Sequence, residues 1–368
     1  MSTLTHVEGI DGHPPHLEPS QLGTKEYWES FYDNSLSHLS SKARARKGQK
    51  RTKDENEAHV RNDEKGKGED DDNGSDEDED EDDDGDDPGT SWFTEHSAPE
   101  KVMSFLTSES FPLAPCNTST STQTQSQSQP QPQPQPNILD LGTGNGSMLA
   151  LLRDEGGFTG GQMVGVDYSP KSIELARRLH HLDSSSMRDD LADTTTTSGG
   201  SGTPAIRFEV WDVFDKRVVE ELDWFPADQG GFDIVLDKGT FDAISLSAAE
   251  VVVDVGAAAG EGGAEGGEKE EENVDTKRSR VVQRRVCERY PGIVRGLVRK
   301  DGFLVVTSCN WTEEELIRWF TRRELGEGEG DGGDRLVVWG RVEYPKFRFG
   351  GQEGQGVCTV CFRRVSGS

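Results

Sequence analysis

Cysteine is scarce in this chain of 368 residues and follows no disulfide pattern. An odd number of scattered cysteines is typical of a protein from a reducing compartment. The five are Cys116, Cys287, Cys309, Cys358 and Cys361. Cys358 and Cys361 have C-x-x-C spacing, but they fall in an expected strand and no second pair or histidine cluster accompanies them. We therefore expect no metal site, and we expect this pair to occupy two strand positions in alternate registers.

Long apolar segments are also absent. No run of about 20 apolar residues exists to cross a bilayer, and Met1 to Ser20 lacks the apolar region of a signal peptide. These absences predict a soluble, intracellular protein with no membrane partner.

Positive charge is in short supply, since the net charge is −29. Much of the negative charge comes from Glu69 to Asp87, a nearly continuous acidic run without lysine or arginine. The rest of the chain is moderately acidic. Phosphate binding needs clustered Lys and Arg, so a nucleic-acid partner is disfavoured. A basic protein partner is permitted. We expect a monomer.

Low-complexity stretches divide the chain into segments. Blocks of one charge and tracts rich in Ser, Gln, Pro or Gly cannot bury apolar surface, and they predict disordered insertions or linkers. We expect a disordered tail over 1–21, an aromatic helix over 22–39, a disordered charged insertion over 40–87, a helical segment over 88–115, a linker over 116–136, and one domain over 137–368 with insertions near 184–202 and 255–273.

The aromatic helix near the start has a buried stripe. Tyr27, Trp28, Phe31 and Tyr32 are spaced as on one helical face, and Thr24 is placed to cap the helix. Two interpretations stay open at this point. The helix packs on the domain, or it is a lid over a cofactor site.

The domain itself alternates strands with helices. Alternation of this kind predicts an α/β fold with a doubly wound, mostly parallel, Rossmann-like sheet of seven strands. We expect strands at 138–141, 163–167, 206–211, 232–237 and 303–308, and a closing pair of strands at 335–342 and 357–363. We expect one helix to begin after Gly146, one to begin at Pro170, and two more to span 281–298 and 312–323. No helix separates the last two strands, so they should form a hairpin at one edge.

The segment from Asn137 to Gly146 is the strongest single motif. An apolar strand carries Asp140 and ends in Gly142, Gly144 and Gly146. Glycines let the backbone turn sharply and approach a ligand. The dinucleotide fingerprint has no acid two residues before its first glycine, and an anion there suits a cationic ligand better than a pyrophosphate. An ordinary strand–helix turn is the alternative. The motif resembles the first motif of seven-stranded S-adenosylmethionine-dependent methyltransferases, in which the turn packs against the methionine part of the cofactor.

Acidic residues end three further strands, and ligands of open α/β sheets bind at the carboxyl ends of the strands. Asp167 can accept hydrogen bonds from a ribose diol, and Tyr168 follows it. Asp212 can accept a hydrogen bond from the exocyclic amine of adenine, and the Val213 backbone can contact the edge of the adenine ring. Asp237 ends the strand where the reacting methyl group should lie. The alternatives are a helix-capping aspartate at Asp167, an Asx turn at Asp212 and a solvated loop after Asp237.

The residues from Asp237 to Ile244, including Lys238 and Phe241, are expected to form one wall of the acceptor site. Methyl transfer from a sulfonium needs an in-line, neutral nucleophile, and positioning supplies much of the rate enhancement. A lysine acceptor must lose a proton, which burial near a cation favours. Asp237, Asp242 and Tyr344 are the candidates for taking that proton, and the sequence does not choose among them.

Several segments together resemble one narrower family. They are Asp140 to Gly146, Leu22 to Trp28, Trp92 to Ala98, Asp237 to Ile244 and Tyr344 to Gly351. They resemble the protein-lysine methyltransferases that modify translation elongation factor 1-alpha. The resemblance implies S-adenosyl-L-methionine as cofactor, a lysine of that factor as acceptor, and the cytoplasm as location; the family is also linked to intracellular transport. It places Trp28, Trp92, Phe93, Lys238 and Phe241 on the substrate side.

Two other functions remain possible on the same fold. A small-molecule N- or O-methyltransferase would use the same cofactor strands. The Asn/Asp-Pro-Pro-Tyr/Phe loop of DNA-adenine and glutamine methyltransferases is absent, because Asp237-Lys238-Gly239-Thr240 stands there. A non-catalytic module that binds S-adenosylmethionine would be expected to lose the glycines or the ribose acid, and both are present.

Overall fold

The computed structural model describes residues 12–41, 93, 95–119, 133–181, 205–255, 280–322, 333–349 and 352–367. The expected insertions over 40–87 (except residues 40 and 41), 184–202 and 255–273 (except residue 255), most of the linker over 116–136, and Trp92 lie outside the described residues. None of the described helices combines the length and the apolar character needed to cross a bilayer.

A seven-stranded sheet forms the centre of the domain, in the order β10-β13-β9-β6-β3-β4-β5. Its strands are β3 (Ile138–Leu141), β4 (Met163–Asp167), β5 (Arg207–Val210), β6 (Phe232–Lys238), β9 (Val298–Ser308), β10 (Arg335–Val342) and β13 (Cys358–Val365). The five strands from β9 to β5 are parallel, and β13 is antiparallel to both of its neighbours. The predicted doubly wound, mostly parallel sheet is confirmed.

The closing pair of strands forms as predicted, but with one added feature. β10 is the edge strand, whereas the last strand of the sheet, β13, lies inside it and pairs with β9 as well. Between the two, β11 (Phe347–Phe349) and β12 (Gln352–Gly354) make a small antiparallel ladder. Cys358 and Cys361 belong to the cores on opposite sheet faces, which agrees with their expected strand positions.

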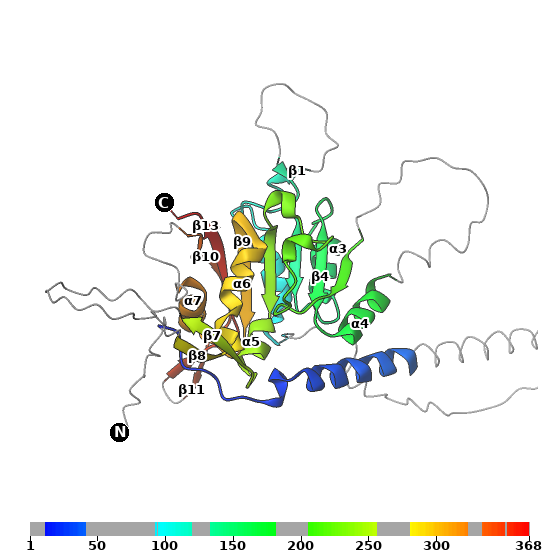
Figure 1. Ribbon diagram of the computed structural model, residues 1–368. Coiled ribbons are helices and arrows are strands. Elements are labelled where there is room, and N and C mark those ends of the chain that lie inside the picture. Colours follow the sequence, from blue (N-terminus) through cyan, green and yellow to red (C-terminus); the bar gives the residue numbers. More distant parts are fainter. Residues whose placement is uncertain are drawn as a thin grey trace, which may run out of the picture.

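Helices cover both faces of the sheet (Figure 1). α2 (Ala98–Leu106), α3 (Ser147–Asp154) and α4 (Pro170–His181) contribute to one core, and α5 (Thr240–Ser245), α6 (Tyr290–Leu297) and α7 (Glu313–Thr321) to the other. Successive strand residues point to opposite faces, so Ile138 enters the first core and Leu139 the second. This burial of both faces explains the apolar, non-alternating strand sequences.

Two predicted helix starts are confirmed by their caps. The Ser169 hydroxyl accepts the Ser172 N–H at 3.3 Å, just before Pro170 at the first helical position. Thr312 and Glu315 form a reciprocal capping box at the start of α7.

The helix predicted over 281–298 is wrong in its first half. Arg280–Arg285 is a strand, β8, that pairs antiparallel with β7 (Glu250–Val255); a 3-10 turn, η7 (Val286–Glu288), and then α6 follow. Valines are frequent in both strands of the pair, and β-branched side chains favour extended backbone. Pro291 does not interrupt a helix but lies in the first turn of α6, where proline is tolerated.

Part of the expected disordered tail is also ordered. The segment over 12–20, called the strap here, runs along the domain before the turn η1 (Gln21–Gly23). Arg285 Nη1 donates to the Leu17 carbonyl at 2.6 Å, and Ser20 N–H donates to the Leu246 carbonyl at 3.1 Å. These bonds involve partners far along the chain, which local composition does not reveal.

Candidate functional site

The glycine turn after β3 has a backbone that only glycine adopts freely. Gly142, Gly144 and Gly146 have φ of +58°, +58° and +78°. A Cβ on Gly142 would lie 2.2 Å from Thr240 Oγ1, and one on Gly146 would lie 2.6 Å from the Phe208 ring. Conformation and crowding therefore both require glycine here.

Asp140 lies buried at the base of this turn. Its carboxylate accepts a 2.8 Å hydrogen bond from the Thr143 hydroxyl. Burial raises the pKa of Asp140 to about 6, against the opposing effect of the Lys238 ammonium. The carboxylate is ionised above about pH 6 and places negative charge where the sequence predicted a cationic ligand.

Asp167, at the end of β4, ties the second strand to the same turn. Its Oδ2 accepts the Gly144 N–H at 3.2 Å and the Ser172 hydroxyl at 2.8 Å, and its Oδ1 accepts the Ser169 N–H at 2.9 Å. The alternative of a helix-start aspartate is thus part of its role. A carboxylate offers about four lone-pair positions, so Oδ1 retains capacity for a ribose hydroxyl.

The adenine-side residues are more open. Asp212 is exposed, and its carboxylate accepts the Phe214 N–H at 2.9 Å, so it forms the Asx turn that was the alternative interpretation. Val213 is half-buried beside it. Tyr168 is half-buried, and Lys25 Nζ lies 5.3 Å from its ring centroid.

The aromatic helix extends over residues 25–41 and lies beside α4 (Figure 1). Tyr32 and Leu36 pack against Leu175 of α4, with Trp28 at the margin of this cluster. The Tyr32 hydroxyl lies 3.1 Å from the position of a Cβ on Gly144. Both interpretations of the helix therefore hold in part: it packs on the domain, and it covers the glycine turn. Sequence reasoning missed Tyr32 as a site residue, because helical spacing shows a face but not what that face covers.

The acceptor side brings together residues distant in sequence. The Phe93 ring lies 2.6 Å from the position of a Cβ on Gly239, and Lys238 Nζ lies 5.7 Å from the centroid of that ring. Phe93 and Tyr344 share a small apolar cluster with Ala98. The Tyr344 hydroxyl is 2.8 Å from Thr359 Oγ1, and burial raises its pKa to about 12. Phe93, Lys238 and Tyr344 therefore lie close together, and we call them the wall; that they contact an acceptor stays a prediction.

Three other predicted residues near this wall are buried and engaged within the protein. Asp237 is 1% exposed and accepts the Thr240 and Phe241 N–H groups and the Tyr290 hydroxyl. Asp242 is buried and accepts the Ser308 hydroxyl and the Cys309 N–H. Phe241 lies in the core, stacked on Tyr290. Their hydrogen bonds and burial give these residues a structural role, and direct contact with an acceptor stays a prediction.

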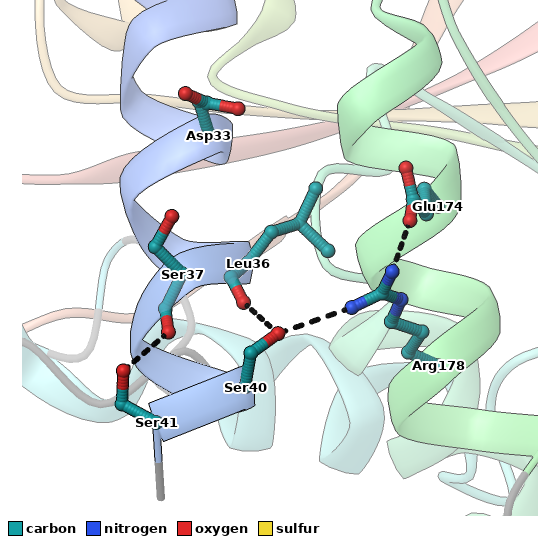
Figure 2. Close-up of a pocket in the computed structure, with 7 residues that line it drawn as sticks. All are labelled: Asp33, Leu36, Ser37, Ser40, Ser41, Glu174 and Arg178. Carbon is teal, nitrogen blue, oxygen red and sulfur yellow. Dashed lines mark hydrogen bonds and ion pairs between the residues drawn. The ribbon is translucent and has the colours of Figure 1, made fainter.

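A separate open groove of about 400 Å³ lies between the helix over 25–41 and α4. Figure 2 shows Arg178 reaching across it, with hydrogen bonds to Glu174 and to Ser40 Oγ. It is lined by Asp33, Leu36, Ser37, Ser40, Ser41, Glu174 and Arg178. None of the predicted site residues lines it.

The sheet order, the glycine turn and the acids at the strand ends resemble those of S-adenosylmethionine-dependent methyltransferases of the seven-stranded class. Residues 133–190, which contain β3, the turn and β4, match the family model described as "Methyltransferase domain". The residues fit this cofactor, since Asp140 and Asp167 meet at a turn that only glycine can form.

Curated relatives narrow the class further. The chain is 28% identical over 351 residues to "Protein-lysine N-methyltransferase EFM4" of Saccharomyces cerevisiae, with 94% of this chain and 96% of that protein covered. It is 25% identical to "Protein-lysine N-methyltransferase efm4" of Schizosaccharomyces pombe, with 94% and 95% covered. It is 24% identical to human "EEF1A lysine methyltransferase 2", with 94% and 88% covered. The resemblance to lysine methyltransferases of elongation factor 1-alpha is confirmed.

Proposed function

We propose that this protein transfers a methyl group from S-adenosylmethionine to a lysine side chain of translation elongation factor 1-alpha. The observation that carries the proposal is the extent of the likeness: it covers 94% of this chain, including the N-terminal helix and the acceptor wall, in relatives named for protein-lysine methylation. With a protein substrate of this kind, we also propose a cytoplasmic, monomeric enzyme without a nucleic-acid partner. A transport role stays a prediction of the resemblance.

On the cofactor side, each residue has a distinct task. The glycine turn and the Asp140 carboxylate would hold the cationic methionine part, and Asp167 would accept a ribose hydroxyl. Asp212 and the Val213 backbone would meet the adenine edge, with Tyr168 beside the ribose. S-adenosylmethionine, when bound, supplies an electrophilic methyl group on a sulfonium.

On the acceptor side, the wall of Phe93, Lys238 and Tyr344 would orient the substrate lysine. An aromatic face attracts a lysine ammonium and also presents an apolar surface to it. The positive charge of Lys238 disfavours a second ammonium nearby, so it lowers the pKa of the substrate lysine and favours the neutral amine that transfer requires. The side chains of Asp237 and Asp242 keep this wall in place through their hydrogen bonds.

The test is direct methylation. The full chain is incubated with S-adenosylmethionine and purified elongation factor 1-alpha, and mass spectrometry then locates added methyl groups. We expect a methylated lysine, and Gly142→Ala should strongly reduce its methylation when S-adenosylmethionine is kept near the Kd of the wild type. Cofactor binding without methylation of any protein in a cell extract would favour the alternative of a non-catalytic module that binds S-adenosylmethionine. Transfer to small molecules alone would favour the other methyltransferase class.

Cofactor affinity should depend on pH through Asp140. Its pKa of about 6 in the free protein means that the carboxylate becomes neutral as the pH falls through that value. We therefore expect the Kd for S-adenosylmethionine to rise by up to about tenfold per pH unit below pH 6, measured by calorimetry between about pH 5 and 8. Asp140→Asn should bind weakly with a flat profile. Asp223→Asn, which changes an exposed acid paired with Arg207, should retain the wild-type profile; a flat wild-type profile would contradict the role of Asp140.

A further inference from the structure

Two histidines of the strap meet a glutamate of η7 on the part of the molecule next to α7. His13, His16 and Glu288 each offer one ligand atom, and these atoms all lie within 4.8 Å of one another. His13 and Glu288 are buried, and His16 is half-buried. None of the three takes part in the cofactor site or the acceptor wall.

The distances suit a small cation. His16 Nε2 lies 3.3 Å from Glu288 Oε1, and His13 Nε2 lies 3.8 Å from Glu288 Oε2. Zinc bonds of roughly 2.0–2.1 Å in tetrahedral geometry place ligand atoms about 3.3 Å apart. The His16–Glu288 pair already has this spacing, whereas the other ligand atoms, up to 4.8 Å apart, would have to move closer together.

The protonation of His13 also points to a ligand. Its Nδ1 lies 2.7 Å from the Pro14 carbonyl oxygen, which can only accept, so Nδ1 carries the proton. In the neutral ring, Nε2 then carries no proton, and its lone pair is next to a carboxylate oxygen of Glu288. Metal-bound histidines commonly donate their other N–H to a backbone carbonyl in this way.

His16 supplies a second observation. Its buried Nε2 makes no well-formed hydrogen bond among the residues that the structure describes, and its nearest polar contact is the Glu288 carboxylate oxygen at 3.3 Å. A buried polar atom without a well-formed hydrogen bond is costly. A metal ion between His16 and Glu288 would satisfy it.

Neighbouring groups hold the three ligands in place and also compete with an ion. The His13 ring stacks on Trp319 of α7, with centroids 4.7 Å apart and an interplanar angle of 15°. Arg285 N–H donates to Glu288 Oε1 at 3.1 Å, and Arg284 Nη1 donates to Oε2 at 2.9 Å. The Arg284 guanidinium is therefore the cation that a metal must displace or tolerate.

We propose that His13 Nε2, His16 Nε2 and the Glu288 carboxylate form a zinc site, with water as the fourth ligand. Two imidazoles and one carboxylate are a common zinc donor set. The ion would fasten the strap to α7 and η7. Because the strap leads through η1 into the helix that covers the glycine turn, zinc would also stabilise that helix on the domain.

The test is zinc binding to the metal-free, full-length protein, by calorimetry with ZnCl2 and by metal analysis after dialysis. We expect one bound zinc per chain, which is lost in His16→Gln and in His13→Phe, a change that keeps a ring on Trp319. Arg284→Gln should bind zinc more tightly than the wild type, because it removes the competing cation. A misfolded variant would bind zinc more weakly, so tighter binding cannot come from misfolding. The matched controls are His38→Gln and His96→Gln, which change exposed histidines elsewhere.

Cobalt substitution separates this site from the cysteines. Co²⁺ bound by imidazole and carboxylate gives visible bands without the near-ultraviolet band of a thiolate ligand. A thiolate band, stoichiometric zinc binding that survives the two histidine changes, or wild-type binding weaker than about 100 μM would each overturn the proposal.

Discussion

Replacing Gly142 by alanine is expected to weaken S-adenosylmethionine binding about 30- to 100-fold. The φ of +58° costs an L-residue about 1–2 kcal/mol. The new Cβ would lie 2.2 Å from Thr240 Oγ1, whose 2.6 Å hydrogen bond to the Leu141 carbonyl must then be disturbed, at about 1 kcal/mol. If the turn moves to relieve both strains, the two costs, together about 2–3 kcal/mol, are lost from cofactor binding. Since about 1.4 kcal/mol corresponds to a tenfold change in Kd, this gives the expected weakening. Calorimetric titration measures the effect.

Gly230→Ala is the matched control for Gly142→Ala. Gly230 also has a positive φ, of +72°, but no atom lies within 4 Å of its added Cβ. It should lose about 1–2 kcal/mol of stability from backbone strain alone, with an unchanged Kd for the cofactor. Equal affinity of Gly142→Ala and wild type would show that the turn does not hold the cofactor.

Replacing Asp237 by alanine is expected to destabilise the domain by about 3–5 kcal/mol, because two buried donors and one partly buried donor lose their acceptor. The midpoint of thermal unfolding should fall by roughly 10 °C. Asp212→Ala removes a carboxylate with one local bond at the surface and should change stability by less than about 1 kcal/mol. A stable but inactive Asp237→Ala would instead return this residue to the candidates for direct catalysis.

The same carboxyl group should make stability depend on pH. Burial raises the pKa of Asp237 to about 7, above the value of 3.8 for an unperturbed aspartate. The stability that its protonated form contributes is complete below pH 3.8 and is lost as the pH rises through about 7. Asp237→Asn lacks this loss. We would measure the free energy of unfolding of both proteins in urea at about pH 5 and pH 8. The value for Asp237→Asn minus that for the wild type should be larger at pH 8 than at pH 5. An equal difference at the two pH values would contradict the raised pKa.

Much of the fold follows from local sequence. The strands at β3, β4 and β6 are short apolar runs that end at glycine or aspartate, and the helix starts at Ser169 and Thr312 have their own capping groups. Such signals act within a few residues, so they can be read from the chain. The hairpin of β7 and β8 could not, because β8 owes its pairing to a partner beyond a long insertion, and residues 281–298 also permit a helix.

The sequence by itself determined the resemblance of this protein to seven-stranded methyltransferases. The glycine turn requires glycine for reasons of backbone conformation, and the acids that follow each strand meet at one sheet edge because parallel strands share their carboxyl ends. Only the tertiary structure shows what each acid contacts. Asp140, Asp167 and Asp237 look alike in the chain, yet Asp140 and Asp167 accept hydrogen bonds from Thr143 and Gly144 of the glycine turn, whereas Asp237 accepts one from the core residue Tyr290. It also decided that Tyr32 covers the turn and that His13 and His16 meet Glu288, because contacts between distant segments depend on packing.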